Sequence, residues 1–437
     1  MIVPTRPEIE VKAAAPEAVF SRGRWIILIF LMALCFISHF NRASITSAGD
    51  ERIMKEFGIS PESMGVIYSA FLIVYTIFMI PGGWLIDLKG PRFALGCMGL
   101  GSALFCAFTG MIGFGIVAAA QVWFALLIVR SLMGLLSVPL HPGAARAVGN
   151  WFPSGQQAFA NGLINGAAVF AYAVVHPIFG GLIDRFDWPV SFVITGSVTA
   201  LLALVWLGLA RDRPAASLEA SPSDLPIVEN DAPPSDSGSG RGRNLLLLTL
   251  SYSAVGYFQY LFFYWLHYYF DSVLHMEKAE SRYFAGLPNL AMAACMPIGG
   301  WLADRVTRWR RTNSAITIVP KVGMLLSALF LICGVFASDR FSIVACFTAA
   351  LGTLGLCEGS FWTVAVNLGR QRGGTSAAIM NTGGNGIGLL APMITPWIGT
   401  HLGWQWGIGV GAVVGVLGAL CWFGIRPCEE KLAVAAA

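Results

Sequence analysis

The chain has 437 residues, of which 56% are hydrophobic and only 12% are charged, and its formal net charge is +4. Soluble domains carry about 25% charged residues, so this composition excludes a soluble globular protein of this length. The modest net charge gives no indication of a nucleic-acid partner. The lipid bilayer is therefore the expected solvent for much of the chain.

Apolar stretches long enough to cross a membrane recur from one end of the sequence to the other. A spanning helix needs about 20 apolar residues. The candidate spans are 25–47, 62–86, 92–115, 117–148, 157–181, 189–210, 245–270, 283–303, 314–337, 341–366, 376–398 and 402–425. The pattern predicts an all-α membrane protein with twelve transmembrane helices.

A polar stretch near the middle divides these spans into two groups of six. Residues 211–243 are rich in Pro, Ser, Gly and Asp, which is typical of a flexible linker. We therefore expect an N-terminal half over 25–210 and a C-terminal half over 244–426. A short segment, 1–24, precedes the first half, and a tail, 427–437, follows the second.

The distribution of Lys and Arg predicts the orientation, because cytoplasmic loops carry an excess of these residues. An even number of spans places both termini on one side. The cations on that side are Arg22, Arg24, Lys89, Arg92, Arg211, Arg213, Arg241, Arg243, Arg305, Arg308, Arg310, Arg311, Arg370, Arg372, Arg426 and Lys431. The opposite loops hold Arg52, Lys55, Arg185, Lys278, Arg282 and Arg340. Both termini are therefore expected in the cytoplasm.

A short motif is repeated in the two halves. Gly83-x-x-x-Asp87-x-x-Gly90-x-Arg92 closes the second span, and a copy containing Asp304-Arg305 closes the eighth. The first copy resembles the signature loop of the major facilitator superfamily. The resemblance implies two pseudo-symmetric six-helix halves around a central site, a recurring transporter plan. We interpret both copies as structural or gating elements that do not bind substrate.

Two arginines lie inside predicted spans, Arg42 in the first and Arg130 in the fourth. A cation there costs several kcal/mol unless it faces a cavity or a partner. The cores of these two spans contain no carboxylate, so the pattern favours a small organic anion as a transient partner. The alternative for Arg42 is a position in the outer interface, with its side chain reaching toward water.

The surroundings of these arginines resemble the anion:cation symporter branch of the superfamily. That branch carries organic anions, such as galactonate and hexuronates, phthalate, tartrate and, in animals, sialate or glutamate. The resemblance implies that Arg42 and Arg130 bind the carboxylate of the substrate. The residues that carry this resemblance are Asn41-Arg42-Ala43, Arg130, Gly134, Pro142-Gly143, Arg146, Trp151-Phe152-Pro153, Gly162, Gly166 and Met380-Asn381-x-Gly383-Gly384-Asn385.

The sequence departs from the branch at two acidic positions. Proton-coupled members have Asp and Glu where this chain has Asn41 and Ser137. Glu358, in the tenth span, follows Gly355 by the interval that separates Ser137 from Gly134. We hypothesise that the coupling carboxylate has moved there, where the membrane disfavours its charged form. The alternatives are an ion pair with a cation such as Lys321 and a purely structural hydrogen-bonded Glu.

Three histidines are further candidates for proton coupling, since imidazole titrates near neutral pH. His39 lies one turn before Arg42 on the same helical face, His141 lies in the fourth span, and His176 lies in the fifth. Each also has a structural alternative, a hydrogen-bonded membrane histidine. His39 is in addition a candidate substrate ligand.

The remaining substrate-binding candidates are Tyr75, Trp362, Asn381 and Asn385. The two asparagines are four residues apart, and an unpartnered amide in lipid is costly, which suits binding of sugar hydroxyls. The aromatic side chains have packing as their alternative. An aromatic run over 257–269 is expected either at the outer gate or in the interfacial belt.

These observations favour a proton-coupled secondary transporter of a sugar acid that works by alternating access. Because Asn41 and Ser137 cannot carry a proton, an uncoupled facilitator or an anion exchanger is the alternative. A transporter-like solute receptor is a remote alternative. The sequence shows no nucleophile elbow, P-loop, dinucleotide fingerprint or metal cluster, so we expect neither an enzyme nor a cofactor. A monomer in a bacterial inner membrane is the expected state.

Overall fold

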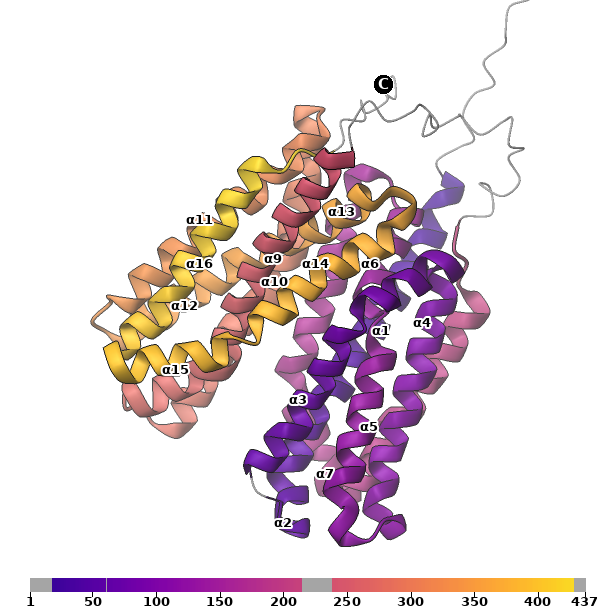
Figure 1. The fold of residues 1–437 in the computed structure, drawn as a ribbon, viewed down its shortest axis with the longest axis vertical. Helices are drawn as coiled ribbons and strands as arrows, with labels where there is room; N and C mark the ends of the chain where they lie inside the picture. The colour runs from indigo at the N-terminus through magenta and orange to yellow at the C-terminus, as the bar shows by residue number, and fades with distance from the viewer. Residues whose placement is uncertain (1–17, 60, 214–237, 428–437) are drawn as a thin grey trace, which may run out of the picture.

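The computed structural model of the chain describes residues 18–59, 61–213 and 238–427. Most of the predicted linker, and much of the two predicted terminal segments, lie outside these ranges. All regular secondary structure in the described residues is helical. Helices before the linker and helices after it gather into two bundles (Figure 1).

The first bundle contains seven labelled helices and four short irregular turns. They are α1 (Ala18–Ala48), η1 (Gly49–Ile53), α2 (Met54–Phe57), α3 (Pro61–Ile77), α4 (Met79–Met111), η2 (Ile112–Ile116), η3 (Ala119–Gln121), α5 (Val122–Ser137), α6 (Leu140–Trp151), η4 (Ser154–Gln156) and α7 (Gln157–Leu209). Two of them each combine two helical segments. The break in α4 is Gly90, with φ 82°, and the break in α7 is Asp187, with φ 65°.

The second bundle contains eight helices and three short turns. They are α9 (Gly238–Tyr268), η5 (Tyr269–Val273), α10 (Lys278–Arg310), η6 (Asn313–Thr317), α11 (Ile318–Val335), α12 (Arg340–Gly355), α13 (Glu358–Gly369), η7 (Arg370–Arg372), α14 (Gly373–Gly388), α15 (Ala391–Leu402) and α16 (Trp404–Gly424). Several predicted spans are interrupted. The run 117–148 is divided between α5 and α6 at Pro139, 341–366 between α12 and α13, and 376–398 between α14 and α15.

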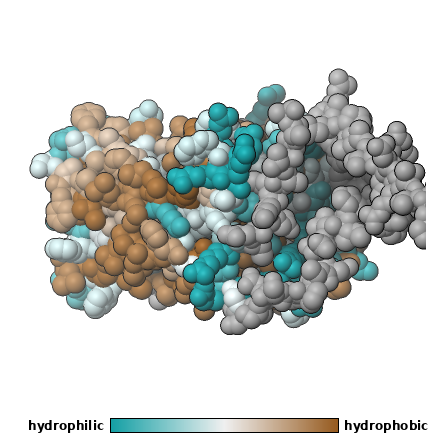
Figure 2. Space-filling view, turned by 90° about the horizontal axis from the view of Figure 1, so that it is seen from above, coloured by the Kyte–Doolittle hydropathy of each residue, from teal (hydrophilic) through white to brown (hydrophobic). Residues whose placement is uncertain are grey.

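Within the described residues, nine helical stretches are long and apolar enough to cross a membrane, and the shorter apolar helix Val66–Ile77 accompanies them. Large apolar side chains are exposed on the outside of the bundles, among them Leu201 and Leu204 of α7 and Leu417 and Leu420 of α16. Figure 2 shows apolar surface over much of the flank that the grey atoms leave in view. Such a surface requires lipid around it. The chain is a multi-pass membrane protein.

The two bundles lie together at the end of the molecule where the chain enters and leaves the linker, and they diverge toward α2 and α15 (Figure 1). Asp87, in α4, accepts hydrogen bonds from the backbone N–H groups of Gly374 and Thr375, both at 2.9 Å. Its partners are the first residues of α14, in the other bundle. A carboxylate at a helix N-terminus satisfies free N–H groups and interacts favourably with the helix dipole.

The repeated copy of the motif makes the reciprocal contact. Asp304, in α10, accepts hydrogen bonds from the N–H groups of Ala158 at 3.2 Å and Phe159 at 2.8 Å, at the start of α7. Each bundle thus caps a helix of the other. We call this pair of contacts, Asp87 with Gly374 and Thr375 and Asp304 with Ala158 and Phe159, the reciprocal caps.

The glycines of the motif serve close packing beside the reciprocal caps. A Cβ atom on Gly83 would lie 2.8 Å from both the Ala378 side chain and the Thr375 backbone, so only glycine fits against α14. Gly90 has a positive φ, and a Cβ there would meet the carboxylate of Asp212. The motif therefore needs Gly83 for close packing against α14 and Gly90 for the break in α4, which agrees with its structural interpretation.

Candidate functional site

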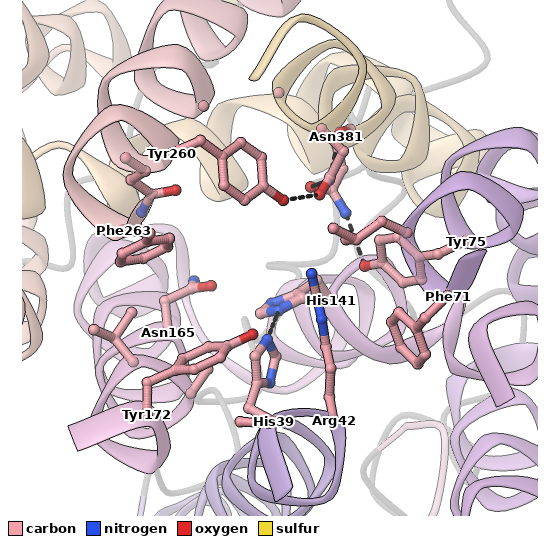
Figure 3. Close-up of a pocket in the computed structure, with 18 of the residues that line it drawn as sticks. His39, Arg42, Phe71, Tyr75, His141, Asn165, Tyr172, Tyr260, Phe263 and Asn381 are labelled. Carbon is pink, nitrogen blue, oxygen red and sulfur yellow. Dashed lines mark hydrogen bonds between the residues drawn. The ribbon is translucent and has the colours of Figure 1, made fainter. Parts of the chain in front are cut away.

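A cavity of about 420 Å³ lies between the two bundles. Helices of both bundles line it, and Figure 3 shows their polar side chains converging on the open space. The predicted residues that line it are His39, Arg42, Tyr75, Arg130, His141, Glu358, Trp362, Asn381 and Asn385. His176 lies on α7, and its side chain falls outside the part of the chain that the structure describes. We call this cavity the central pocket.

Arg42 and Arg130 form the cationic side of the central pocket. Arg130 is only 1% exposed, and its Nη2 donates to the carbonyl oxygen of Arg42 at 2.7 Å. Both guanidinium groups lie over the ring of Phe71, at 5.0 Å for Arg42 and 5.6 Å for Arg130. These are cation–π distances. The Arg42 side chain thus lines the central pocket, and its depth in the membrane stays a prediction.

No carboxylate neutralises this pair among the described residues. The ion pair seen among the described residues lies elsewhere: it joins Arg52 and Asp187 at 4.0 Å, and both side chains are largely exposed. Arg130 contacts only neutral groups through its Nη atoms, and its buried Nε has no hydrogen-bond partner. Two uncompensated cations beside a cavity create an electrostatic site for an anion.

The two positions that differ from the anion:cation symporter branch face away from the central pocket. Asn41 donates from Nδ2 to Thr199 Oγ1 at 2.7 Å, toward α7. Ser137 Oγ donates to the Met133 carbonyl at 2.7 Å and lies 3.3 Å from Ser102 Oγ. Neither residue lines the pocket. Both positions hold buried polar contacts inside the first bundle.

His39 and His141, which the sequence presents separately, form a pair. Their Nε2 atoms are 3.2 Å apart. His39 Nδ1 lies 2.9 Å from the Cys35 carbonyl, which can only accept, so this nitrogen carries the hydrogen. When both rings are neutral, His39 Nε2 therefore accepts a hydrogen bond from His141 Nε2–H.

The histidine pair extends to the second bundle through an aromatic contact. The His141 ring stacks on Trp362 with 5.3 Å between centroids and 25° between planes. Trp362 Nε1 in turn donates to Glu358 Oε2 at 3.2 Å, and the Tyr252 hydroxyl donates to the same oxygen at 3.3 Å. Three of the four titratable candidates, His39, His141 and Glu358, thus lie in one continuous series across the pocket.

Glu358 has no cationic partner in the described residues. The ion pair with Lys321 considered from the sequence is absent, because Lys321 Nζ lies over the Phe423 ring, 5.0 Å from its centroid. The carboxyl group is only 2% exposed. A buried carboxyl with neutral donors and no counter-ion is placed to gain and lose a proton.

Asn381 and Asn385 of α14 line the central pocket, and Figure 3 shows Asn381 across the open space from Arg42. Asn381 Nδ2 donates to the Tyr75 hydroxyl at 3.2 Å, which links the two bundles. The Tyr260 hydroxyl donates to Asn385 Oδ1 at 3.0 Å, and Asn385 Nδ2 donates to Asn381 Oδ1 at 2.9 Å. This network offers neutral donors and acceptors suited to hydroxyl groups.

The pocket also contains residues that the sequence did not single out as binding candidates. Tyr260 and Phe263, from the aromatic run over 257–269, line the pocket, as does Gln259. Asn165 and Tyr172 on α7 were missed. Their seven-residue spacing on one helical face was the available signal.

The remaining motif residues lie apart from the central pocket. The backbone N–H of Arg92 donates to Asp212 Oδ1 at 2.8 Å, and its Nε donates to the Leu207 carbonyl at 3.1 Å, so it ties α4 to the end of α7. Arg305 is exposed. These positions favour the structural interpretation of the motif over a role in binding.

The sequence profile described as Major Facilitator Superfamily matches residues 31–388. The chain belongs to the Major Facilitator Superfamily. Members of this superfamily are transporters and not enzymes, so this chain is a transporter.

Curated relatives cover nearly the whole of this transporter. The "Probable galactarate/D-glucarate transporter GudP" of Bacillus subtilis (strain 168) is 28% identical over 424 residues, which are 91% of each chain. The "D-galactonate transporter" of Escherichia coli O6:H1 is 24% identical over 430 residues, 94% of this chain and 97% of the relative. The names of these relatives agree with the sugar-acid branch that the sequence resembles.

Solved structures share the fold. The proton:xylose symporter XylE superposes with a TM-score of 0.69 at 13% identity, covering 94% of this chain and 97% of its own. The transporter FucP, solved in the outward conformation, gives a TM-score of 0.64 at 17% identity, covering 92% and 98%. At these identities the likeness establishes the fold alone.

Proposed function

We propose that this transporter moves a sugar acid across the membrane by alternating access, with a proton as the coupled ion. The observation that carries the proposal is the pair Arg42 and Arg130, which share the Phe71 ring beside a 420 Å³ cavity and have no carboxylate partner among the described residues. The names of the relatives, galactarate, D-glucarate and D-galactonate transporters, support the substrate class.

The substrate binds with its carboxylate toward the first bundle. Arginine suits this role because its planar donors match carboxylate geometry. The hydroxyl groups then face Asn381, Asn385 and Tyr260, which line the pocket from the second bundle. Binding neutralises the two guanidinium groups, which lowers the cost of closing the pocket around the loaded site.

The alternation uses the two bundles as its moving parts. We propose twelve spans, six in each half, and both termini in the cytoplasm, as the Lys and Arg distribution indicates. The end held by the reciprocal caps is then the cytoplasmic end. The described conformation corresponds to a carrier closed toward the cytoplasm, and transport requires breaking the contacts of Asp87 and Asp304.

Proton coupling uses the series from the histidine pair to Glu358. Protonation of Glu358 removes an anion that would repel a bound carboxylate, so proton and substrate favour each other's binding. An ionised Glu358 also disfavours a substrate with two carboxylates. Both pocket arginines belong to the first bundle, so the second carboxylate would face Glu358 in the second bundle. An uncoupled facilitator or exchanger is the second candidate, favoured by Asn41 and Ser137 at the family's acidic positions.

The test is uptake of labelled galactonate into proteoliposomes with and without an inward proton gradient. We expect gradient-dependent accumulation in the wild type, and no accumulation in Arg130→Ala or Glu358→Gln. Lys321→Gln is the matched control, since Lys321 lies away from the central pocket. Equilibration that ignores the gradient and survives Glu358→Gln, but not Arg130→Ala, would establish the uncoupled alternative instead.

Unlabelled glucarate, added as a competitor, tests the number of carboxylates. In the wild type, glucarate should compete better at low pH than at high pH, because a protonated Glu358 tolerates the second carboxylate. In Glu358→Gln this pH difference should disappear. Equal competition by glucarate at all pH values in the wild type would show that Glu358 does not face the substrate.

A further inference from the structure

Two amide side chains of the central pocket, Gln259 of α9 and Asn289 of α10, have no part in the network of α14. Gln259 Nε2 donates to the Met292 sulfur at 3.5 Å. Asn289 lies three residues before Met292 on the same helix, and residues at that spacing are neighbours on one helical face. The two amides therefore come from adjacent positions on neighbouring helices. We call Gln259 and Asn289 the amide pair.

The amide pair leaves much of its hydrogen-bonding capacity unused. Asn289 Oδ1 is buried and has no hydrogen-bond partner in the part of the chain that the structure describes. The Asn289 side chain lines the cavity, and rotation about its last bond, a soft torsion, turns this oxygen toward the open space. For Gln259 the printed sequence of contacts ends at a thioether sulfur, which is a weak acceptor.

The amides of α14 differ from the amide pair because they already bond to protein groups. Asn385 Nδ2 donates to Asn381 Oδ1 at 2.9 Å, and the hydroxyl groups of Tyr75 and Tyr260 complete their network. A substrate hydroxyl that enters this network replaces one hydrogen bond with another, so its net contribution is small. A hydroxyl that meets the amide pair supplies a bond that the protein lacks, and leaving a buried amide unsatisfied is costly. The amide pair therefore has the larger influence on which substrate is accepted.

The charge around the amide pair defines the chemistry of the group that it takes. Among the described residues, α9 and α10 contribute only neutral side chains to the pocket lining. The arginines belong to α1 and α5 of the first bundle. We infer that the amide pair binds the uncharged, hydroxylated end of the substrate, remote from its carboxylate, and so selects a long polyhydroxylated acid.

This inference rests on the proposed function, which places the carboxylate at Arg42 and Arg130. A substrate that reaches both the arginines and the amide pair contacts both bundles, and it supplies hydrogen bonds as water leaves the closing pocket. A short acid cannot reach the amide pair, and a long acid without hydroxyl groups leaves its amides unpaired. Both should be poor substrates. The inferred substrate class is a polyhydroxylated monocarboxylate long enough to span the pocket.

The experiment uses the full-length protein in proteoliposomes with an inward proton gradient. It measures KM for labelled galactonate and the inhibition constants of two unlabelled competitors, glycerate and hexanoate. Glycerate is a short hydroxy acid, and hexanoate has six carbons without hydroxyl groups. The test variant is Gln259→Leu/Asn289→Leu, which removes both amides and nearly keeps their volume. The matched control is Asn367→Leu, an exposed amide that does not line the central pocket.

In the test variant we expect KM for galactonate to rise about thirtyfold, the loss of two hydrogen bonds, while the inhibition constant of glycerate stays within about twofold. Hexanoate should compete better than in the wild type, and Asn367→Leu should change none of the three values. The unchanged glycerate value shows that the arginine side of the pocket is intact. Each single substitution should raise KM about fivefold, which provides the readout if the double variant does not melt cooperatively.

Two results in the variant would overturn the amide pair: an unchanged KM for galactonate, or equal weakening of galactonate and glycerate, which would indicate a general change of the pocket. The proposed function fails in a different sample. Absence of galactonate uptake by a cooperatively melting wild type would contradict the proposed substrate, and the inference would fall with it.

Discussion

The two sides of the central pocket differ in charge although they belong to repeated halves of one fold. The first bundle supplies both arginines and both histidines, and the second supplies Glu358 and the amides Asn381 and Asn385. The reciprocal caps, by contrast, use the same residue type in the same way in each half. The repeat is thus preserved where the halves hold each other and has diverged at the central pocket, the proposed substrate site. This asymmetry would give an anion bound there a defined direction.

The largest expected effect comes from the cationic side. Arg130→Lys keeps the charge but loses the planar set of donors that contacts the Arg42 and Asn41 carbonyls. We expect galactonate uptake to fall about 100-fold, because a lysine ammonium cannot form the two parallel hydrogen bonds that a buried guanidinium makes to a carboxylate. Arg42→Lys, at the less buried position, should lose about tenfold under the same assay. The reverse order would mean that Arg42 is the main anchor.

The reciprocal caps should respond equally to matched substitutions. Asp87→Asn and Asp304→Asn each weaken one charged helix cap, worth about 1 kcal/mol, so each should shift the closed-to-open ratio about fivefold. The measurement is maleimide labelling of Val366→Cys, which lines a second cavity between the bundles beside the reciprocal caps, after replacement of the exposed Cys97 and Cys333. Labelling that rises in only one variant would show that the repeat is not functionally equivalent.

A smaller effect is expected on the amide side. Asn381→Ala removes a neutral hydrogen-bonding group, so KM for galactonate should rise about fivefold while kcat changes little. Asn367→Ala, an exposed amide outside the central pocket, is the control. A fall in kcat with unchanged KM would indicate that Asn381 acts during the conformational change, through its hydrogen bond to Tyr75.

The smallest effect should come from Lys321→Gln. Its ammonium group contacts the Phe423 ring near the outside of the bundle, an interaction of about 0.5–1 kcal/mol. Uptake should stay within about twofold of the wild type, and the melting temperature should fall slightly. Loss of gradient-driven accumulation in this variant would instead revive an ion pair between Lys321 and Glu358.

Much of the fold followed from the sequence, because apolar runs and repeated motifs are local signals. The superfamily and the all-helical architecture are confirmed by the family match, and the apolar helices are visible in the structure. The helix interruptions near Pro139 and Leu356 were not predicted, since the hydropathy of those runs is continuous through them. A glycine or proline inside a hydrophobic run barely lowers its mean hydropathy, so the run still reads as one uninterrupted span.

The site was only partly predictable, because its geometry arises between helices distant in sequence. Composition singled out Arg42, Arg130 and Glu358, since charges inside apolar runs stand out. The direct contact of His39 with His141, and its extension to Trp362, depend on how α1, α6 and α13 pack. Asn165 and Tyr172 escaped notice because a polar residue on a glycine-rich helix is common.

The reciprocal caps have a consequence for how this transporter can evolve. Each carboxylate is met by backbone N–H groups, at Gly374 and Thr375 in one case and at Ala158 and Phe159 in the other. At Asp87 the side chain of Thr375 also takes part, since its hydroxyl donates to Oδ2 at 2.6 Å. At Asp304, as a backbone donor, every residue except proline is equivalent to Ala158 or Phe159. Selection on the Asp304 contact therefore acts on one side of it, and a search for co-varying positions would miss this attachment between the halves.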